Sequence, residues 1–456
     1  MNTIWFPDLK AATGPKYKTL SDAIRRGIIA GQLQEGEQLP PVREIAWELK
    51  VTPGTIARAY SVLVEAGVLD AVVGRGTFVA AQKTLSHIPD WPDVVDLRSP
   101  KLPDVGQSEV VRRALRKISH MSTPLLQMYP TASTDLSARE AVMKLCEHKV
   151  LGGLSVEDVI LSHGGQNAIS LIFQTVLHGE APVVLCEDLS YSGFRHAARL
   201  MRAQIIGLAS DEEGIIPEAF EAACRTHKPQ LLCTSPEVLS PTTLRTGLER
   251  RKRLVQIART YDVQVLEDDC YAMIDSGLPS YRALMPERGW YISSISKLLT
   301  PALRIGYVFA PVGQGRELRR TGQYSFYGIA TPMTELTSEL LNDPQLDELL
   351  NSVRTSVAKL VQILVNGLGA YDLYWREGVP FVWLSLPRGW RAGAFASACE
   401  KAGVLVRPAD EFALLDGRAP HAVRVSINGQ IAPECYEAAI ARMREILDAP
   451  PRDIEV

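Results

Sequence analysis

The stretch that decides the fold is ISSISKLLTPALRIGYVF, residues 292–309 of a 456-residue chain. A β-type run that ends at Ile295 leads into a loop, and a second apolar run, Ile305–Phe309, carries the chain away. The loop contains Lys297, and a lysine at a strand end among apolar neighbours loses the hydration that favours its ammonium form. The sequence therefore predicts that Lys297 acts as a neutral amine able to form a Schiff base with an aldehyde.

Hydroxyl and cationic side chains flank this lysine. Ser294 and Ser296 precede Lys297, and Arg304 follows seven residues later. Such donors suit a phosphate dianion, and a phosphate close to an aldehyde indicates pyridoxal 5'-phosphate as the cofactor. The same residues also fit an ordinary solvated strand exit, so the rest of the chain has to decide between the two interpretations.

Composition indicates a water-soluble globular protein with two or three domains, since 46% of the residues are hydrophobic and the net charge is −3. No apolar run approaches the length of a membrane span, and the N-terminus does not resemble a signal peptide. The seven cysteines are scattered, without a C-x-x-C pair. We expect reduced core cysteines, no structural metal and a cytoplasmic location.

Residues 1–80 have the pattern of a winged helix-turn-helix. A first helix starts near Lys18, and two short amphipathic helices follow, joined by a turn in which Thr52 and Pro53 provide an N-cap and a first-turn proline. Two helices joined by a tight turn are typical of the helix-turn-helix. The run LDAVVGRGTFVA then predicts a hairpin that turns at 74–76 and forms the wing.

This segment resembles the GntR family of bacterial regulators through GQLQEGEQLPPVREIAWELKVTPGTIARAYSVLVEAGVLDAVVGRGTFVA, residues 31–80. The resemblance implies that the second helix of the motif enters the major groove of operator DNA. It also implies a set of DNA-facing residues: Arg43, Thr52, Thr55, Arg58 and Arg75. One departure is Pro53, which stands where the family usually has a DNA-contacting arginine.

After a predicted linker at 81–95, residues 96–456 alternate β-type runs with helical patterns. The predicted strands are 159–162, 183–187, 204–208, 230–234, 263–267, 291–295 and 305–309. Most are continuous apolar runs, as in parallel strands buried on both faces. We predict an α/β fold with a larger part at about 136–322. A smaller α+β part comprises about 96–135 and 323–448.

Candidate ligand residues follow the predicted strands, where ligands of such sheets collect. Gly165 and Gln166 open a helix whose N–H groups suit an anion, and Tyr191 offers a ring that stacks on a pyridine. Asp268 suits a protonated pyridine nitrogen, and Tyr271 suits the phenolic oxygen of the ring. Each feature alone has an ordinary structural explanation, but their joint order along the chain favours a cofactor site.

Across about 96–448 the chain resembles the fold-type-I pyridoxal-phosphate enzymes, which have the aspartate-aminotransferase fold. The resemblance implies a cofactor set of Gly165, Gln166, Tyr191, Ser240, Asp268, Tyr271, Ser294, Ser296, Lys297 and Arg304. It also implies that Tyr129 reaches the phosphate of the neighbouring subunit and that Arg424 binds a substrate carboxylate. Two departures are Ser240, where asparagine is usual, and the lack of a glycine shortly after Tyr129.

A winged helix in front of an aminotransferase-like domain resembles the MocR subfamily of GntR regulators. The resemblance implies a head-to-tail, domain-swapped homodimer that senses an amine or amino-acid effector by aldimine exchange at Lys297. Known effectors of the family include γ-aminobutyrate, taurine, diamino acids and vitamin B6.

Two other functions stay open. One is a functional aminotransferase with an accessory DNA-binding domain, and the other is a binding module with an empty, degenerate pocket. The winged helix argues against a purely metabolic enzyme, and the nearly complete cofactor set argues against an empty pocket. A residual aminotransferase half-reaction is compatible with a regulator.

Overall fold

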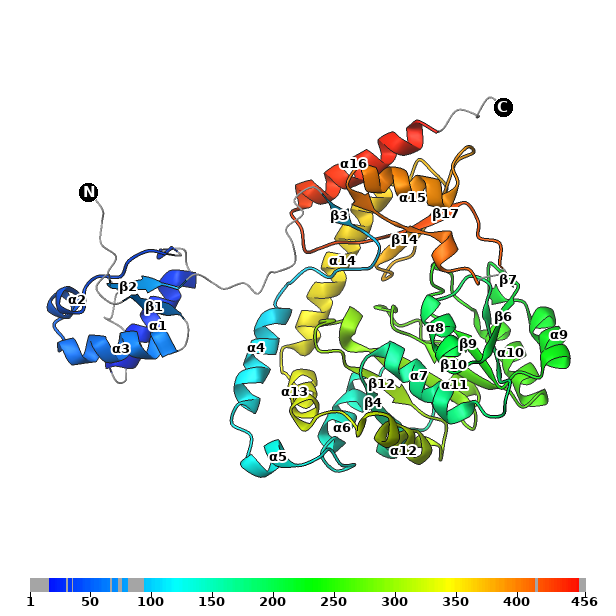
Figure 1. Cartoon of the computed structure of the whole chain (residues 1–456), viewed down its shortest axis with the longest axis horizontal. Helices are drawn as coiled ribbons and strands as arrows, with labels where there is room; N and C mark the ends of the chain where they lie inside the picture. Colours follow the sequence, from blue (N-terminus) through cyan, green and yellow to red (C-terminus); the bar gives the residue numbers. More distant parts are fainter. Residues whose placement is uncertain are drawn as a thin grey trace. The chain divides into compact units, whose positions relative to one another are not determined.

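The computed structural model describes residues 16–29, 32–34, 36–65, 68–72, 76–80, 94–414 and 417–450. The chain divides into two compact units, Met1–Pro92 and Asp93–Val456, and Figure 1 labels most of their helices and many of their strands. Within the described residues, every helix is too short or too polar to cross a lipid bilayer.

The first unit is a winged helix-turn-helix, as predicted. Its elements are α1 (Lys16–Ile29), α2 (Val42–Glu48), α3 (Pro53–Glu65), β1 (Leu69–Val72) and β2 (Gly76–Val79). The turn before α3 is closed by Thr52, whose hydroxyl accepts a hydrogen bond from the backbone N–H of Thr55 at 3.3 Å. Apolar side chains at helical spacing, such as Ile56 and Leu63 on α3, form the core of the unit. Strands β1 and β2 pair in antiparallel fashion as the wing, and residues 73–75 of its turn lie outside the described residues.

The second unit is built on a seven-stranded sheet with the order β4-β12-β11-β10-β9-β5-β6. The strands are β4 (Val159–Ser162), β5 (Val183–Glu187), β6 (Gln204–Leu208), β9 (Leu231–Thr234), β10 (Gln264–Asp268), β11 (Gly289–Ser294) and β12 (Gly306–Phe309). Three of them have the predicted bounds, and the other four differ by one or two residues at their ends. Strand β12 runs antiparallel to both of its neighbours, whereas the remaining pairs are parallel. The mostly parallel α/β fold is thereby confirmed.

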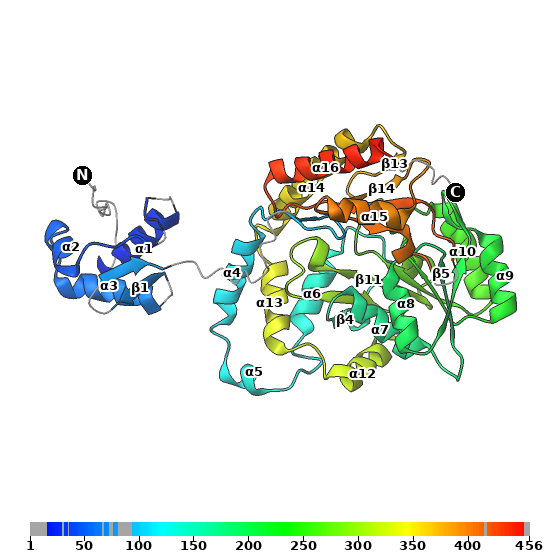
Figure 2. The same ribbon diagram turned by 45° about the horizontal axis from the view of Figure 1, so that its top comes forward.

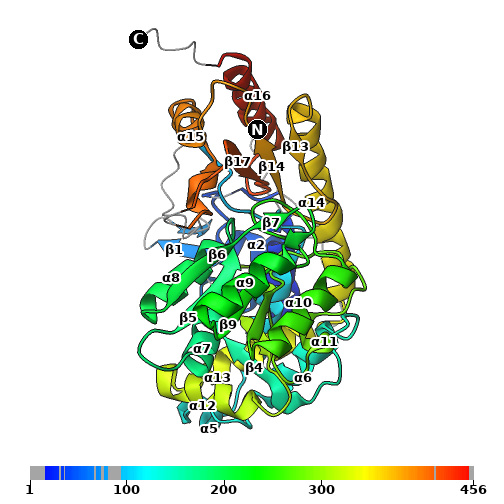
Figure 3. The same ribbon diagram turned by 90° about the vertical axis from the view of Figure 1, so that its right-hand side faces the viewer.

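Helices cover both faces of this sheet (Figures 1 and 3). One face packs against α7 (Gly165–Val176), α8 (Ser192–Leu200) and α12 (Gly315–Phe326). The other face packs against α4 (Gln107–Ile118), α6 (Leu136–Leu145), α9 (Pro217–His227), α10 (Leu248–Thr260), α11 (Tyr281–Leu284) and α13 (Thr331–Leu341). The central strands are therefore buried on both faces, which explains why their sequences are continuously apolar.

A smaller four-stranded sheet has the order β13-β14-β17-β16. Its strands are β13 (Leu373–Tyr374), β14 (Phe381–Ser385), β16 (Arg407–Pro408) and β17 (Ala422–Ser426). Figure 2 shows α14 (Leu346–Leu368), α15 (Ala392–Lys401) and α16 (Pro433–Asp448) gathered around it. Helix α14 joins the two parts, because its first turns pack with the large sheet and its later turns pack with the small one.

The remaining elements are short. They are β3 (Val95–Asp96), which pairs with β15 (Val404–Leu405), the hairpin β7 (Ser210–Asp211) and β8 (Gly214–Ile215), α5 (Thr123–Gln127), and three 3-10 turns, η1 (Val156–Asp158), η2 (Ile295–Lys297) and η3 (Ala409–Glu411).

All seven cysteines are free thiols. Five of them are buried, as expected of core residues, but Cys270 is half-buried and Cys435 is exposed at the start of α16. Cys435 follows Pro433 and Glu434 at a helix start, and this context fits an exposed position better than a core position.

Candidate functional site

A cavity of about 110 Å³ lies at one edge of the seven-stranded sheet. It is lined by Gly165, Gln166, Tyr191, Asp268, Cys270, Tyr271, Ser294, Ser296, Lys297 and Arg304. Parallel strands place their carboxyl ends at the same edge of a sheet, and the antiparallel β12 begins at that edge just after Arg304. The structure thus brings together most of the predicted cofactor residues. Cys270 was not among them, although it stands between Asp268 and Tyr271 in the sequence.

Lys297 is the last residue of η2 and is half-buried. Its Nζ donates a hydrogen bond to the carbonyl oxygen of Pro100 at 3.3 Å. The same Nζ lies 5.9 Å from the centroid of the Tyr271 ring. The amine is therefore held between the end of β11 and the segment 97–102, which packs in the core of the smaller part, with an aromatic ring on one side.

One end of the cavity is rich in hydrogen-bond donors. Ser296 is buried, and its hydroxyl has no hydrogen-bond partner among the described residues. Arg304 adopts a left-handed φ of 53°, which is unusual for a residue with a side chain. Its guanidinium lies close to Gly164, where an added Cβ would stand 2.8 Å from Nη2 of the arginine. Together with the open N–H groups at the start of α7, these donors form an anion cradle.

Asp268, the last residue of β10, provides the negative charge of the cavity. It is 9% exposed, and its carboxylate accepts a hydrogen bond from the backbone N–H of Cys270 at 3.0 Å. Burial raises the pKa of Asp268 to about 6. Among the described residues it forms no ion pair, so a protonated ring nitrogen would supply the cation that this buried carboxylate lacks.

Tyr191 is positioned by two neighbours. Its hydroxyl donates to Oε1 of Gln166 at 3.1 Å, and Nε2 of Gln166 donates to the carbonyl oxygen of Gly193 at 3.0 Å. A Cβ on Gly193 would stand 2.1 Å from the Tyr191 ring, so only glycine allows this ring position. The side chain of Gln166 therefore orients the tyrosine, and its backbone N–H is the group left for a phosphate.

Arg424, on β17, is 1% exposed and does not line the cavity. It donates to the Ser240 hydroxyl at 2.9 Å and to the carbonyl oxygen of Arg98 at 3.0 Å, while its Nε has no partner among the described residues. The rings of Phe381 and Phe412 lie 4.8 Å from its guanidinium carbon. Burial lowers the pKa of Arg424. Ser240, expected beside the cofactor ring, thus holds Arg424.

Tyr129 lies apart from the cavity of its own chain. It is 79% exposed, and its ring packs against Tyr327 with the ring centroids 5.9 Å apart. The predicted role of this residue in a neighbouring subunit remains a prediction.

Four of the predicted DNA-facing residues lie on or next to α2 and α3. Arg43 is exposed in the first turn of α2, and the hydroxyls of Thr52 and Thr55 are hydrogen-bonded at 2.9 Å. Arg58 is exposed on α3, but its guanidinium carbon lies 4.3 Å from the centroid of the Tyr17 ring. Arg75 lies outside the described residues.

One exposed aromatic residue of the first unit was not among the residues predicted to face DNA. Trp47 is 83% exposed and follows Arg43 by one turn on the same face of α2.

The residues around the larger unit's cavity fit pyridoxal 5'-phosphate. The unpartnered Ser296 hydroxyl, Arg304 and the start of α7 would hold the phosphate. Asp268 would face the ring nitrogen, Tyr191 would contact the ring, and Lys297 would lie at the carbonyl carbon. The fit rests on three separate features of the cavity, namely an anion cradle, a buried carboxylate without a cation, and an amine.

Comparisons with known proteins agree with this description. Residues 16–79 match the bacterial regulatory proteins of the gntR family, and residues 92–443 match aminotransferase class I and II. The HTH-type transcriptional regulator YdeF of Bacillus subtilis is 29% identical over 97% of each chain. The vitamin B6 salvage pathway transcriptional repressor PtsJ of Salmonella typhimurium is 28% identical, covering 91% of this chain and 95% of that protein.

The fold of the larger unit is that of solved aminotransferases. The α-aminoadipate aminotransferase LysN of Thermus thermophilus, complexed with N-(5'-phosphopyridoxyl)-L-leucine, superimposes with a TM-score of 0.69 at 24% identity, over 78% of this chain and 92% of that one. The chain belongs to the aminotransferase class I and II family and, with a gntR-family domain in front, has the architecture of the MocR-type transcriptional regulators.

Proposed function

We propose that the protein regulates transcription by binding operator DNA through its winged helix and by sensing an amine or amino acid at the Lys297 cavity. The observation that carries the proposal is the meeting of Lys297, Asp268 and Arg304 in one cavity of a chain that also has a gntR-family domain. Since operator DNA is the target, we place the protein in the cytoplasm, and cell fractionation that finds it elsewhere would contradict this placement.

Bound pyridoxal 5'-phosphate supplies an electrophilic carbon that reacts with primary amines. The chain's own residues hold and orient it. The cradle at Ser296 and Arg304 neutralises its phosphate, and the buried Asp268 carboxylate stabilises a proton on the ring nitrogen. Lys297 provides the competing amine, and the Pro100 carbonyl 3.3 Å away accepts a hydrogen bond from its Nζ.

The effector is proposed to carry both a primary amine and an anionic group. The amine is needed because the effector must compete with Nζ of Lys297 for the carbonyl carbon. The anionic group follows from Arg424, a buried guanidinium that has an unpartnered Nε and no ion pair among the described residues. A carboxylate would supply the charge that Arg424 lacks, and guanidinium binds carboxylates in bidentate geometry.

Effector binding is proposed to change DNA affinity through the homodimer. A ligand shifts an equilibrium only through unequal affinity for its states, and Arg424 lies on the small sheet whereas Lys297 lies at the edge of the large one. An effector that contacts both would favour one arrangement of the two parts of the unit.

The homodimer itself is proposed from the surface around Tyr129. Exposed apolar side chains of α5, the loop after it and the end of α12 gather near the Tyr129–Tyr327 contact. They are Leu126, Met128, Tyr129, Tyr324 and Tyr327. Exposed apolar residues that form a group often mark a protein–protein interface.

The alternative is a functional aminotransferase, which the class I and II family match supports. Both functions use the same cofactor residues, so steady turnover of an amino acid with a keto acid separates them. Sustained turnover would favour the aminotransferase. If the protein has its cofactor bound and shows no turnover, the sensor is favoured.

Lys297→Ala is expected to abolish covalent attachment of the cofactor while leaving the fold intact, since the half-buried Lys297 side chain is not a core packing residue. Borohydride reduction followed by peptide mass mapping should find a phosphopyridoxyl label at Lys297 of the wild type and none in the variant. Lys401→Ala, at an exposed lysine, should label like the wild type. Equal labelling of Lys297→Ala and wild type would refute the assignment.

Arg43→Ala and Arg58→Ala are each expected to weaken DNA binding. If each arginine contacts one phosphate, the slope of log K against log salt should become shallower by about 0.9. The measurement is a salt titration of binding to a duplex that the protein itself selects from random sequence. Arg388→Ala, an exposed arginine of the other unit, serves as the control. An unchanged slope in both variants would mean that α2 and α3 face away from the DNA backbone.

Arg424→Met is expected to remove a preference for amines that carry a carboxylate. The wild type should bind an amino acid more tightly than the matched amine without the carboxylate, and the variant should lose about 1.5–3 kcal/mol of this difference, the typical strength of a hydrogen bond to a charged group. Titration of the visible absorption of the bound cofactor measures both affinities. If the preference survives in the variant, the carboxylate assignment fails and vitamin B6 itself becomes the better candidate signal.

The full-length protein is expected to sediment at about twice its chain mass of 50.1 kDa. Tyr129→Glu combined with Tyr327→Glu should shift it to the monomer, because two charges would be buried in the interface. Tyr374→Glu, at an exposed tyrosine of the small sheet, should leave the mass unchanged. A wild-type monomer at all accessible concentrations would overturn the dimer proposal.

A further inference from the structure

A second and larger cavity, of about 430 Å³, adjoins the cofactor cavity. Its walls come from the end of α6 and the segment after it, from the residues that follow β10, from β11, β12 and the residue after η2, and from the end of α13 and the first turns of α14. Cys270 lines both cavities. The predicted cofactor residues do not line this second cavity, so the proposed function does not account for it.

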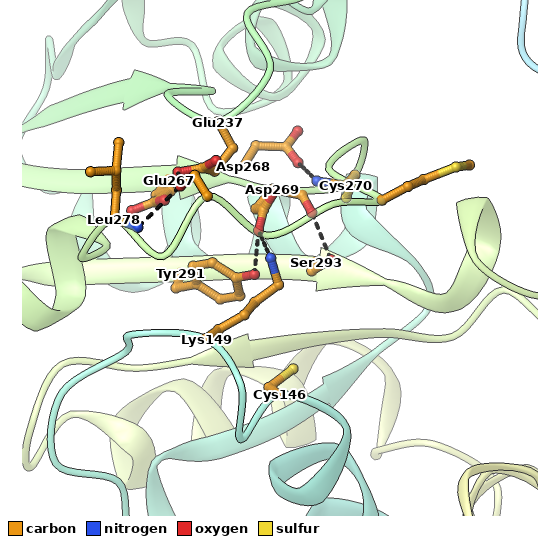
Figure 4. A network of polar contacts seen from close by, with 12 residues as sticks. Cys146, Lys149, Glu237, Glu267, Asp268, Asp269, Cys270, Leu278, Tyr291 and Ser293 are labelled. Atoms are coloured by element: carbon orange, nitrogen blue, oxygen red, sulfur yellow. Dashed lines mark hydrogen bonds and ion pairs between the residues drawn. The ribbon is translucent and has the colours of Figure 1, made fainter. Parts of the chain in front are cut away.

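Asp269 is the most buried carboxylate of this cavity, at 4% exposure. Its Oδ2 accepts hydrogen bonds from Nζ of Lys149 and from the hydroxyl of Tyr291, both at 2.6 Å, and its backbone oxygen accepts from the Ser293 hydroxyl at 2.8 Å (Figure 4). Its Oδ1, in contrast, has no hydrogen-bond partner among the described residues. A buried carboxylate oxygen without a donor is costly, and a ligand that brings an N–H group would remove that cost.

The charge of the lining favours a cation. Five carboxylates line the cavity, Glu147, Asp269, Asp275, Asp343 and Asp347, against three cationic side chains, Lys144, Lys149 and Arg354. One of the five, Asp343, is neutralised from outside the lining by an ion pair with Arg113 at 2.8 Å. Arg354 donates to the Met273 carbonyl oxygen at 2.8 Å and to the Asn351 side chain at 2.9 Å, so it is held by neutral acceptors. Lys149 is already paired with Asp269. The carboxylates of Asp275 and Asp347 form no ion pair among the described residues, and the cavity keeps an excess of negative charge.

Part of the remaining wall is apolar. It is formed by Leu145, Met273, Leu298, Leu341, Leu346 and Leu350. A buried carboxylate, the more exposed carboxylates Asp275 and Asp347 and the leucine side chains together match a molecule with a cationic head and a hydrocarbon chain. The volume lies within the range of about 300–1,000 Å³ that is usual for small-molecule sites.

We infer that this cavity is a second ligand site, which takes a small organic ammonium ion with a short hydrocarbon chain. The ammonium group donates a hydrogen bond to Asp269, the rim carboxylates Asp275 and Asp347 add electrostatic attraction, and the chain packs on the leucines. The site goes beyond the proposed function, since it needs neither Lys297 nor the cofactor's carbonyl carbon.

The test uses N,N-dimethylbutylamine as its probe, because a tertiary amine has no second N–H and cannot condense with an aldehyde. Isothermal titration of the full-length protein with its cofactor bound should show saturable binding at one site per chain. The neutral alcohol 1-hexanol should bind much more weakly, since it lacks the charge. Lys297→Ala should bind the amine like the wild type, which separates this site from the proposed effector site.

Asp275→Asn combined with Asp347→Asn should weaken the amine about five- to tenfold, because each partly exposed carboxylate contributes up to about 1 kcal/mol, and 1.4 kcal/mol corresponds to a factor of ten. The matched control combines Asp372→Asn with Asp410→Asn, two exposed carboxylates outside the cavity, and should bind within about twofold of the wild type. Asp269→Asn should weaken binding more than the rim variant does, and the rim variant keeps the test decisive if Asp269→Asn fails to fold.

Three results would overturn the inference. The first is that titration with millimolar amine gives no saturable heat of binding. The second is that the rim variant and its control bind the amine with equal affinity. The third is that potassium chloride displaces the amine, whereas choline chloride at the same ionic strength does not. The last result would assign the site to an inorganic cation instead.

Discussion

A parallel sheet brings the carboxyl ends of its strands to one edge, and the cofactor cavity depends on that constraint. Gly165, Tyr191, Asp268 and Lys297 are far apart in sequence, yet each lies at or just after the end of a strand of the same sheet. Strand β12 runs the other way, so its beginning lies at that edge and delivers Arg304 to the helix α7 start. A reversal of β12 would carry Arg304 to the opposite edge and leave the anion cradle without its guanidinium.

The two aspartates at the end of β10 show how one strand can serve two cavities. Successive side chains of a strand point to opposite faces, and Asp268 and Asp269 are successive residues. Asp268 lines the smaller cavity, where burial raises its pKa to about 6 and where it forms no ion pair with any described residue. Burial also raises the pKa of Asp269, and Lys149 offsets part of that effect. Burial alone would lower the pKa of Lys149, but the Asp269 carboxylate raises it. Lys149 thus counteracts the effect of burial on Asp269, which lines the larger cavity.

Much of the fold follows from sequence, because it depends on periodicity and on local signals. The apolar runs at 159–162, 183–187 and 204–208 are strands with those bounds, and Thr52 with Pro53 starts a helix. The antiparallel direction of β12 has no such signal, since the apolar pattern of a buried strand does not depend on the direction in which the strand runs. The pairing of Arg424 with Ser240, of Gln166 with Tyr191 and of Arg58 with Tyr17 joins residues distant in sequence. The larger cavity was missed for the same reason, because its walls come from segments more than 100 residues apart.

The central claim is that chemistry at Lys297 alters DNA binding, and one measurement tests it directly. Fluorescence anisotropy of a duplex selected by the protein gives its Kd with and without each member of a panel of amines and amino acids. The account predicts at least one compound that changes the Kd of the wild type by about fivefold or more, within the usual range of allosteric coupling, and leaves Lys297→Ala unchanged. An equal change in both proteins, or no change with any compound while the cofactor is bound, would contradict it.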